Sequence, residues 1–268
     1  MPLLEKLPTR RNRAFDTAIT RLRGLLDQIV AEYQQDDTER ADLLSMLMNA
    51  RDQDTGQPMP AHQLRNEVIN VLAAGMETTA DTLAWILHER GQHPEIDQRA
   101  HDEAAHVVGD LAVTLDDLPR LPYIQSVVKE ALRIHPPTNL LMRKTVAPVD
   151  LNGVRIPVGT EVIVSPLLTH HDPNLFADPT RFDPDRWTRE ETASLPKGAY
   201  LPFGMGNRQC VGEAFALTEI PIVLATLLAR WQLRPVPGHV VHPVQAVTVS
   251  PGRLPMTAVP RHVRTSSS

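Results

Sequence analysis

The single cysteine of this sequence is the residue most able to do chemistry. Cys210 is the only cysteine among 268 residues, so it cannot form an internal disulfide. Glycines on both sides of it, in Phe203-Gly204-Met205-Gly206-Asn207-Arg208-Gln209-Cys210-Val211-Gly212, allow the backbone to turn tightly around the sulfur. A helix is expected to follow at Glu213, and a helix N-terminus favours thiolate over thiol. The pattern indicates a caged thiolate of the kind that ligates haem iron where O–O bonds are cleaved, although a lone cysteine is often buried and inert.

A second candidate is an acidic and a basic residue of opposite charge on one helix. Glu130 and Arg133 lie three residues apart in Lys129-Glu130-Ala131-Leu132-Arg133, so they share one helix face and can form an ion pair. Pro136 and Pro137 follow shortly after. Taken alone this is weak evidence, because such pairs commonly decorate a solvated face.

The third candidate lies within a long helix, in Ala73-Ala74-Gly75-Met76-Glu77-Thr78-Thr79. Gly75 costs about 1 kcal/mol relative to alanine inside a helix, so a packing or functional reason is expected for it. A missing side chain would leave room for a ligand, and a threonine hydroxyl that bonds back to a carbonyl can distort the helix locally. The alternative is an ordinary helix with a tolerated glycine.

The elements that must position these residues are mainly helices. Apolar spacing and stop signals predict helices over residues 15–33, 41–50, 61–90, 94–108, 122–134 and 213–230. Asn152-Gly153 predicts a hairpin between residues 149–151 and 154–156, and a further short strand is expected at 161–165. The 24 prolines are concentrated in the second half, which should therefore be rich in loops.

The three motifs, which follow one another along the chain at residues 73–79, 129–133 and 203–212, resemble those of the cytochrome P450 family. The resemblance implies a mainly α fold with small β-sheets, truncated so that it contains that family's helices G to L and the C-terminal β elements. The whole chain would then be one partial P450 domain. Within it we expect helices G and H over 1–60, helices I to K over 61–134, β elements and a meander over 135–200, the Cys loop and helix L over 201–230, and the last strands and tail over 231–268.

The same resemblance implies residue roles. Cys210 would be the axial thiolate of haem b, with Phe203 and Gly204 beside it and Gly75 leaving room for oxygen. Thr78 would assist oxygen activation and Glu77 would relay protons. Glu130, Arg133 and Arg181 would form a buried network that fixes the Cys loop. Arg143 and Arg208 would bind the haem propionates, although either could instead be an exposed arginine. The substrate-facing positions would be residues 138–141, the helix near Ala74, and the late turn near residues 247–249.

Composition and other motifs exclude several classes. A net charge of −5 gives no basic surface for nucleic acid. No apolar run is long enough to span a membrane, and no signal-peptide pattern is seen, so a cytoplasmic location is expected. His170-His171-Asp172 has the composition of metal ligands, but no third cluster supports a metal site. Gly204-x-Gly206 is no dinucleotide fingerprint, because Gln209 stands where the third glycine belongs.

By resemblance the expected activity is O2-dependent monooxygenation of an apolar small molecule, with electrons from a ferredoxin or flavoprotein reductase. The alternative is an inactive remnant that serves as a haem-binding or protein-interaction module. Because P450 helices A to F would be absent, the long helix should need cover for the apolar residues Val68, Ile69, Leu72, Leu83 and Ile86. We therefore expect a homodimer, or a partner chain over this helix.

Overall fold

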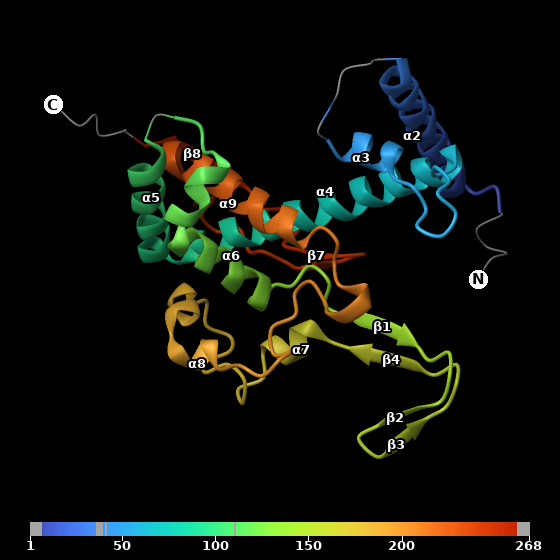
Figure 1. Ribbon diagram of the computed structural model, residues 1–268. Helices are drawn as coiled ribbons and strands as arrows, with labels where there is room; N and C mark the ends of the chain where they lie inside the picture. Colours follow the sequence, from blue (N-terminus) through green and yellow to red (C-terminus); the bar gives the residue numbers. More distant parts are fainter. Residues whose placement is uncertain (1–6, 36–39, 41, 110, 262–268) are drawn as a thin grey trace. The chain divides into compact units, whose positions relative to one another are not determined.

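The computed structural model describes residues 7–35, 40, 42–109 and 111–261 (Figure 1). Helices predominate in these residues, and the strands are short. The α-helices are α2 (Arg10–Gln35), α3 (Leu43–Asn49), α4 (Ala61–Gln92), α5 (Pro94–Val108), α6 (Pro122–Ile134), α7 (Pro166–His170), α8 (Glu190–Ala193) and α9 (Glu213–Arg230). The 3-10 helices are η1 (Leu115–Arg120), η2 (Pro184–Thr188) and η3 (Gly206–Arg208). The strands are β1 (Leu141–Lys144), β2 (Val149–Leu151), β3 (Val154–Ile156), β4 (Glu161–Val164), β5 (Trp231–Pro235), β6 (Val244–Gln245), β7 (Val249–Ser250) and β8 (Met256–Pro260).

The chain divides into two compact units, one ending at Ala74 and the other beginning at Gly75. The first unit contains α2, α3 and the start of α4. Asp42 caps α3 by accepting a bond from the Ser45 amide at 2.9 Å, and it also accepts one from the Tyr33 hydroxyl at 2.8 Å. Arg65 of α4 forms an ion pair with Asp27 of α2 at 2.7 Å. These polar contacts tie the three helices together.

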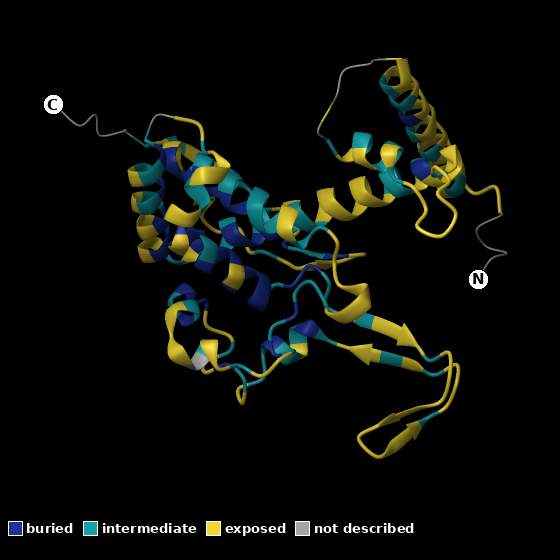
Figure 2. Cartoon of the chain, viewed as in Figure 1, coloured by how far each residue is buried: buried dark blue, intermediate teal, exposed yellow. Residues whose placement is uncertain are grey.

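The second unit is built around α5, α6, α9 and the later turns of α4. The strongly amphipathic α6 buries ten of its 13 residues, because its apolar side chains recur at helical spacing. Buried positions of α5 and α9 meet it in one cluster, which appears as the dark blue region shared by these helices in Figure 2. This cluster is the core, and every candidate site residue from Gly75 onward belongs to the same unit.

The strands form two-stranded antiparallel pairs: β1 with β4, β2 with β3, β5 with β8 and β6 with β7. In the β2–β3 hairpin Asn152 and Gly153 have φ of 52° and 82°, the left-handed values that a two-residue hairpin turn requires. In the first pair Leu141 faces Val164 and Arg143 faces Val162.

The predicted elements can be compared with these bounds. Helices at 94–108, 122–134 and 213–230 are confirmed, whereas α2 runs longer than its predicted range and α3 is shorter. Strand β1 was not predicted. Within the described residues, no helix combines the length and apolar character needed to cross a membrane.

The prediction that five apolar residues of the long helix need cover is wrong for two of them. Ile86 is fully buried in the core, and Leu83 packs against it, because α5, α6 and α9 already supply neighbours there. Val68 and Ile69 are half-buried. Leu72, at 50% exposure, is the one of the five that is largely open to solvent.

Candidate functional site

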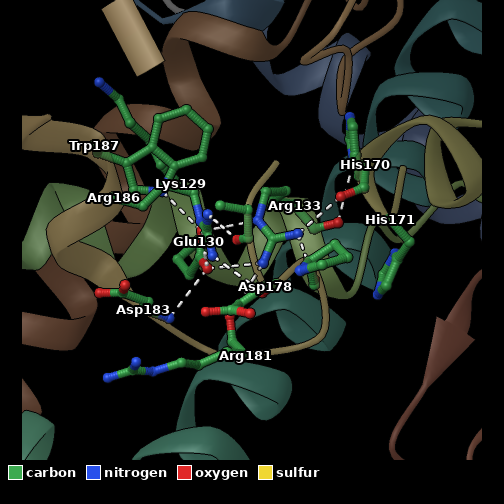
Figure 3. Close-up of polar contacts among 12 residues, drawn as sticks. Lys129, Glu130, Arg133, His170, His171, Asp178, Arg181, Asp183, Arg186 and Trp187 are labelled. Carbon is green, nitrogen blue, oxygen red and sulfur yellow. Dashed lines mark hydrogen bonds and ion pairs between the residues drawn. The ribbon is translucent and has the colours of Figure 1, made fainter. Parts of the chain in front are cut away.

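A buried ion cluster lies on the C-terminal half of α6 (Figure 3). Glu130 and Arg133 are both fully buried, and the guanidinium binds the carboxylate through two bonds, from Nε at 3.0 Å and from Nη2 at 2.8 Å. Nη1 of Arg133 also donates to the carbonyls of His170 and Pro179, at 2.8 and 2.7 Å. A bidentate pair of this kind is strong and directional, so it fixes the segments that follow β4 onto α6.

The second guanidinium on Glu130 comes from Arg186. Its Nε lies 3.3 Å from Glu130 Oε1, and its terminal nitrogens donate to the carbonyls of Ala177 and Asp178, at 2.6 and 3.2 Å. Glu130 also accepts bonds from the Asp183 amide and the Trp187 indole, both at 3.0 Å. Two positive charges thus face one carboxylate, and main-chain carbonyl dipoles satisfy the remaining donors.

The prediction that the Arg181 side chain is the third member of this network is corrected here. Arg181 is exposed and contributes its main-chain carbonyl, which accepts a bond from Arg133 Nη2 at 3.2 Å. The reason is geometric. The chain turns after Pro179 so that the Arg181 backbone faces Arg133, and only at Pro184–Thr188 does the 3-10 helix η2 direct a guanidinium inward. Arg186 and Trp187 were therefore missed, although both stand in the run Asp183-Pro184-Asp185-Arg186-Trp187.

His170 connects this cluster to the Cys loop, which we define as residues 201–212. Its Nε2 accepts a bond from the Leu201 amide at 2.9 Å, so Nδ1 carries the proton and donates to the Arg133 carbonyl at 3.1 Å. Burial lowers the pKa of His170 from 6.5 to about 4, which keeps the ring neutral in this tautomer. The motif His170-His171-Asp172 suggests only a metal-ligand role, which the lack of a third cluster argues against, and gives no sign of this structural link.

The Cys loop is a tight turn. Gly204 and Gly206 have φ of 70° and 74°, a conformation that side chains rarely adopt. The Cys210 amide donates to the Phe203 carbonyl at 2.9 Å, which closes the loop just before α9 begins. The Cys210 side chain is exposed. A thiol on a closed loop, three residues ahead of a helix and open to its surroundings, is suited to bind a metal centre as thiolate.

The other predicted loop residues lie around this turn. Phe203 packs against the core. A Cβ at Gly204 would lie 3.7 Å from Leu141 Cδ1, so β1 passes close to the loop. Because side chains alternate along a strand, Arg143 lies on the same face of β1 as Leu141. Arg143 and Arg208 are both exposed, and the only bond described for the Arg143 guanidinium is to the Met142 carbonyl.

The α4 segment is a continuous helix through Gly75 and Thr78. A Cβ at Gly75 would meet no atom within 4 Å, so this side of the helix is open. The Thr82 hydroxyl donates to the Thr78 carbonyl at 2.8 Å. Glu77 is exposed, and its carboxylate accepts a bond from Thr248 at 3.1 Å.

Comparison with known proteins agrees with this fold. A family model described as Cytochrome P450 matches residues 1–255. The chain is 42% identical to cyclooctat-9-en-7-ol 5-monooxygenase of Streptomyces melanosporofaciens, over 97% of this chain and 56% of that protein. It is 39% identical to pentalenene oxygenase of Streptomyces avermitilis, over 92% of this chain and 55% of that protein. A retinoic-acid-bound cyanobacterial P450, CYP120A1, superposes with a TM-score of 0.87 at 29% identity, covering 94% of this chain and 59% of that one.

A mainly helical fold with a buried Glu130 cluster and a closed cysteine loop matches the class of protein that the sequence motifs predicted. The chain belongs to the cytochrome P450 family. It spans about half the length of the curated relatives that it matches.

Proposed function

We propose that this chain carries the haem-binding part of a P450 monooxygenase that oxidises an apolar terpene-like molecule. Support comes from the family membership and from two relatives whose names refer to the oxidation of cyclooctat-9-en-7-ol and pentalenene. The observation that carries the proposal is the exposed Cys210 thiol on a loop closed by its own amide bond to Phe203.

The residues present fit a haem group. Cys210 would bind the iron as thiolate, and Gly204 and Gly206 permit the turn that presents the sulfur. Arg143 and Arg208 are free of buried ion pairs in the described structure and would bind the propionates. When bound, the haem supplies the activation of molecular oxygen.

The protein's own groups would then manage protons and orientation. Thr78 would donate a hydrogen bond on the open side of α4 next to Gly75, and Glu77 would pass protons toward it. Residues 138–141 and 247–249 would contact the substrate. A ferredoxin or flavoprotein reductase would supply electrons, and we propose the cytoplasm as the location.

The test is the absorption spectrum of the reduced CO complex after reconstitution with haem. We expect the long-wavelength band of thiolate ligation in the wild type and its loss in Cys210→Ala. The matched control is Thr226→Val on α9, where the hydroxyl donates to the Ile222 carbonyl of its own helix at 2.7 Å. An unchanged spectrum in Cys210→Ala would refute the assignment. Haem binding without turnover of a terpene would favour the alternative of a haem-binding remnant.

A further inference from the structure

Residues 246–248 form the turn between β6 and β7. One face of α4 contacts this turn through hydrogen bonds. Glu77, Asp81 and Trp85 are spaced by four residues and therefore lie on one helix face. The Thr248 hydroxyl lies 3.1 Å from Glu77 Oε1 and 2.6 Å from Asp81 Oδ2. One turn further along, the Trp85 indole donates to the Val249 carbonyl at 2.8 Å.

The burial pattern of this turn is the reverse of the usual one. Thr248 is 4% exposed, whereas its apolar neighbour Val247 is 86% exposed. A buried hydroxyl is costly unless it is hydrogen-bonded, and the two carboxylates of α4 supply its acceptors. The apolar side chain is thus left facing outward at the tip.

A second set of bonds ties the turn to the segment after α6. The Val249 amide donates to the Pro137 carbonyl at 3.1 Å, and the Ala246 amide donates to the Thr248 carbonyl at 2.9 Å. Asn139 donates to the Gln245 side chain at 2.9 Å. Residues 137–139, the turn and α4 therefore meet through Thr248 and its neighbours.

Further contacts hold the Trp85 side chain in place beneath this turn. The Trp85 ring stacks on His135 with centroids 3.9 Å apart and planes 7° apart. His135 Nε2 in turn lies 2.6 Å from Glu89 Oε1. Since Glu89 is four residues beyond Trp85, the same face of α4 continues to support the contact.

We propose that Thr248 is a positioning residue that fastens the substrate-facing turn to the proton-delivery segment of α4. The Thr248 hydroxyl lies within hydrogen-bond distance of both Glu77 and Asp81 and can donate its single proton to either carboxylate. The place of the turn and the orientation of the Glu77 carboxylate are therefore set together. This inference rests on the proposed function for the roles of the turn and of Glu77, but the clamp itself is a property of the folded chain.

The test is amide hydrogen exchange at Ala246 and Val249. Thr248→Val keeps the shape and removes the hydroxyl, and we expect exchange at both amides to accelerate about tenfold, as loss of a bond to a charged group predicts. Thr248→Ser should retain the wild-type rates, since it restores the hydroxyl. Thr226→Val is the matched control and should leave these two amides unchanged.

A variant that lacks both carboxylates tests whether Glu77 and Asp81 are the acceptors of the Thr248 hydrogen bond. When Glu77→Ala and Asp81→Ala are both present, adding Thr248→Val should cause no further acceleration. The proposal is overturned if Thr248→Val alone leaves the exchange unchanged, if Thr248→Ser behaves like Thr248→Val, or if the valine effect persists without the two carboxylates. Exchange is read on the chain with or without haem, so a failed CO spectrum would count against the proposed function and leave this result standing.

Discussion

At the scale of single residues, the partners of Glu130 offset the free-energy cost of burying its charge. The carboxylate accepts bonds from Arg133, Arg186, Trp187 and the Asp183 amide. Removal of one charged partner from such a cluster leaves buried groups unpaired, which costs more than the pair itself contributes. Two arginines could complete the cluster. The Arg186 side chain is buried against Glu130, whereas the Arg181 side chain is exposed, so mutation of each residue distinguishes their contributions to stability.

We expect Arg186→Ala to lower the free energy of unfolding by about 3 kcal/mol, because it leaves the Glu130 charge undercompensated and the Ala177 and Asp178 carbonyls without donors. Arg181→Ala is the matched control, and it should change stability by no more than about 0.5 kcal/mol, since its side chain is exposed. Urea unfolding measures both. Equal losses in the two variants would contradict the assignment of Arg186.

At the scale of elements, His170 joins α7 to α6 and to the Cys loop. Its two ring nitrogens serve the Arg133 carbonyl and the Leu201 amide. Protonation would place a second hydrogen where Leu201 already donates, so the link requires the neutral ring. The position of the cysteine loop is therefore coupled to the charge of one histidine.

This coupling predicts a pH dependence of stability. The pKa of His170 is lowered by burial from 6.5 to about 4, so between these values the unfolded chain binds more protons than the folded one. The contribution is fully present above pH 6.5 and is lost as pH falls toward 4, amounting to about 3 kcal/mol. The free energy of unfolding of His170→Gln should decrease less steeply than that of the wild type as the pH falls from 6.5 to about 4.

The control for this prediction is His62→Gln, which alters an exposed histidine of α4. It should follow the wild-type pH profile. If His170→Gln also kept the wild-type slope, the neutral histidine would not be the group responsible.

At the scale of the whole molecule, large apolar side chains remain at the surface. Leu72 on α4 is 50% exposed, and Leu111 after α5 is 76% exposed. We propose that the chain self-associates through the exposed face of α4, because a contact there would remove the exposed apolar side chains of Val71 and Leu72 from water. Leu72→Glu should weaken association about tenfold or more, since it places a charge in the contact.

Light scattering over a range of concentrations measures this. Leu111→Glu is the control, as it adds the same charge on a different element, and it should leave association unchanged. A wild-type chain that stays monomeric at every concentration would show that this face has no such role.

The sequence by itself determined the features that depend on local order. The glycines around Cys210, the Asn152-Gly153 turn and the spacing of Glu130 and Arg133 predicted a closed loop, a hairpin and an ion pair, because each depends on neighbours within a few residues. The helix bounds at 94–108 and 122–134 follow from the same kind of local pattern.

The tertiary structure alone decided which distant residues meet. Arg186 rather than Arg181 reaches Glu130, His170 lies between α6 and the Cys loop, and Thr248 reaches back 167 residues to Asp81. Sequence distance carries no information on such contacts, since they depend on how loops turn after each element. Nor does hydropathy predict a buried threonine beside an exposed valine, because the carboxylates that make that burial favourable belong to α4, which is distant in the sequence.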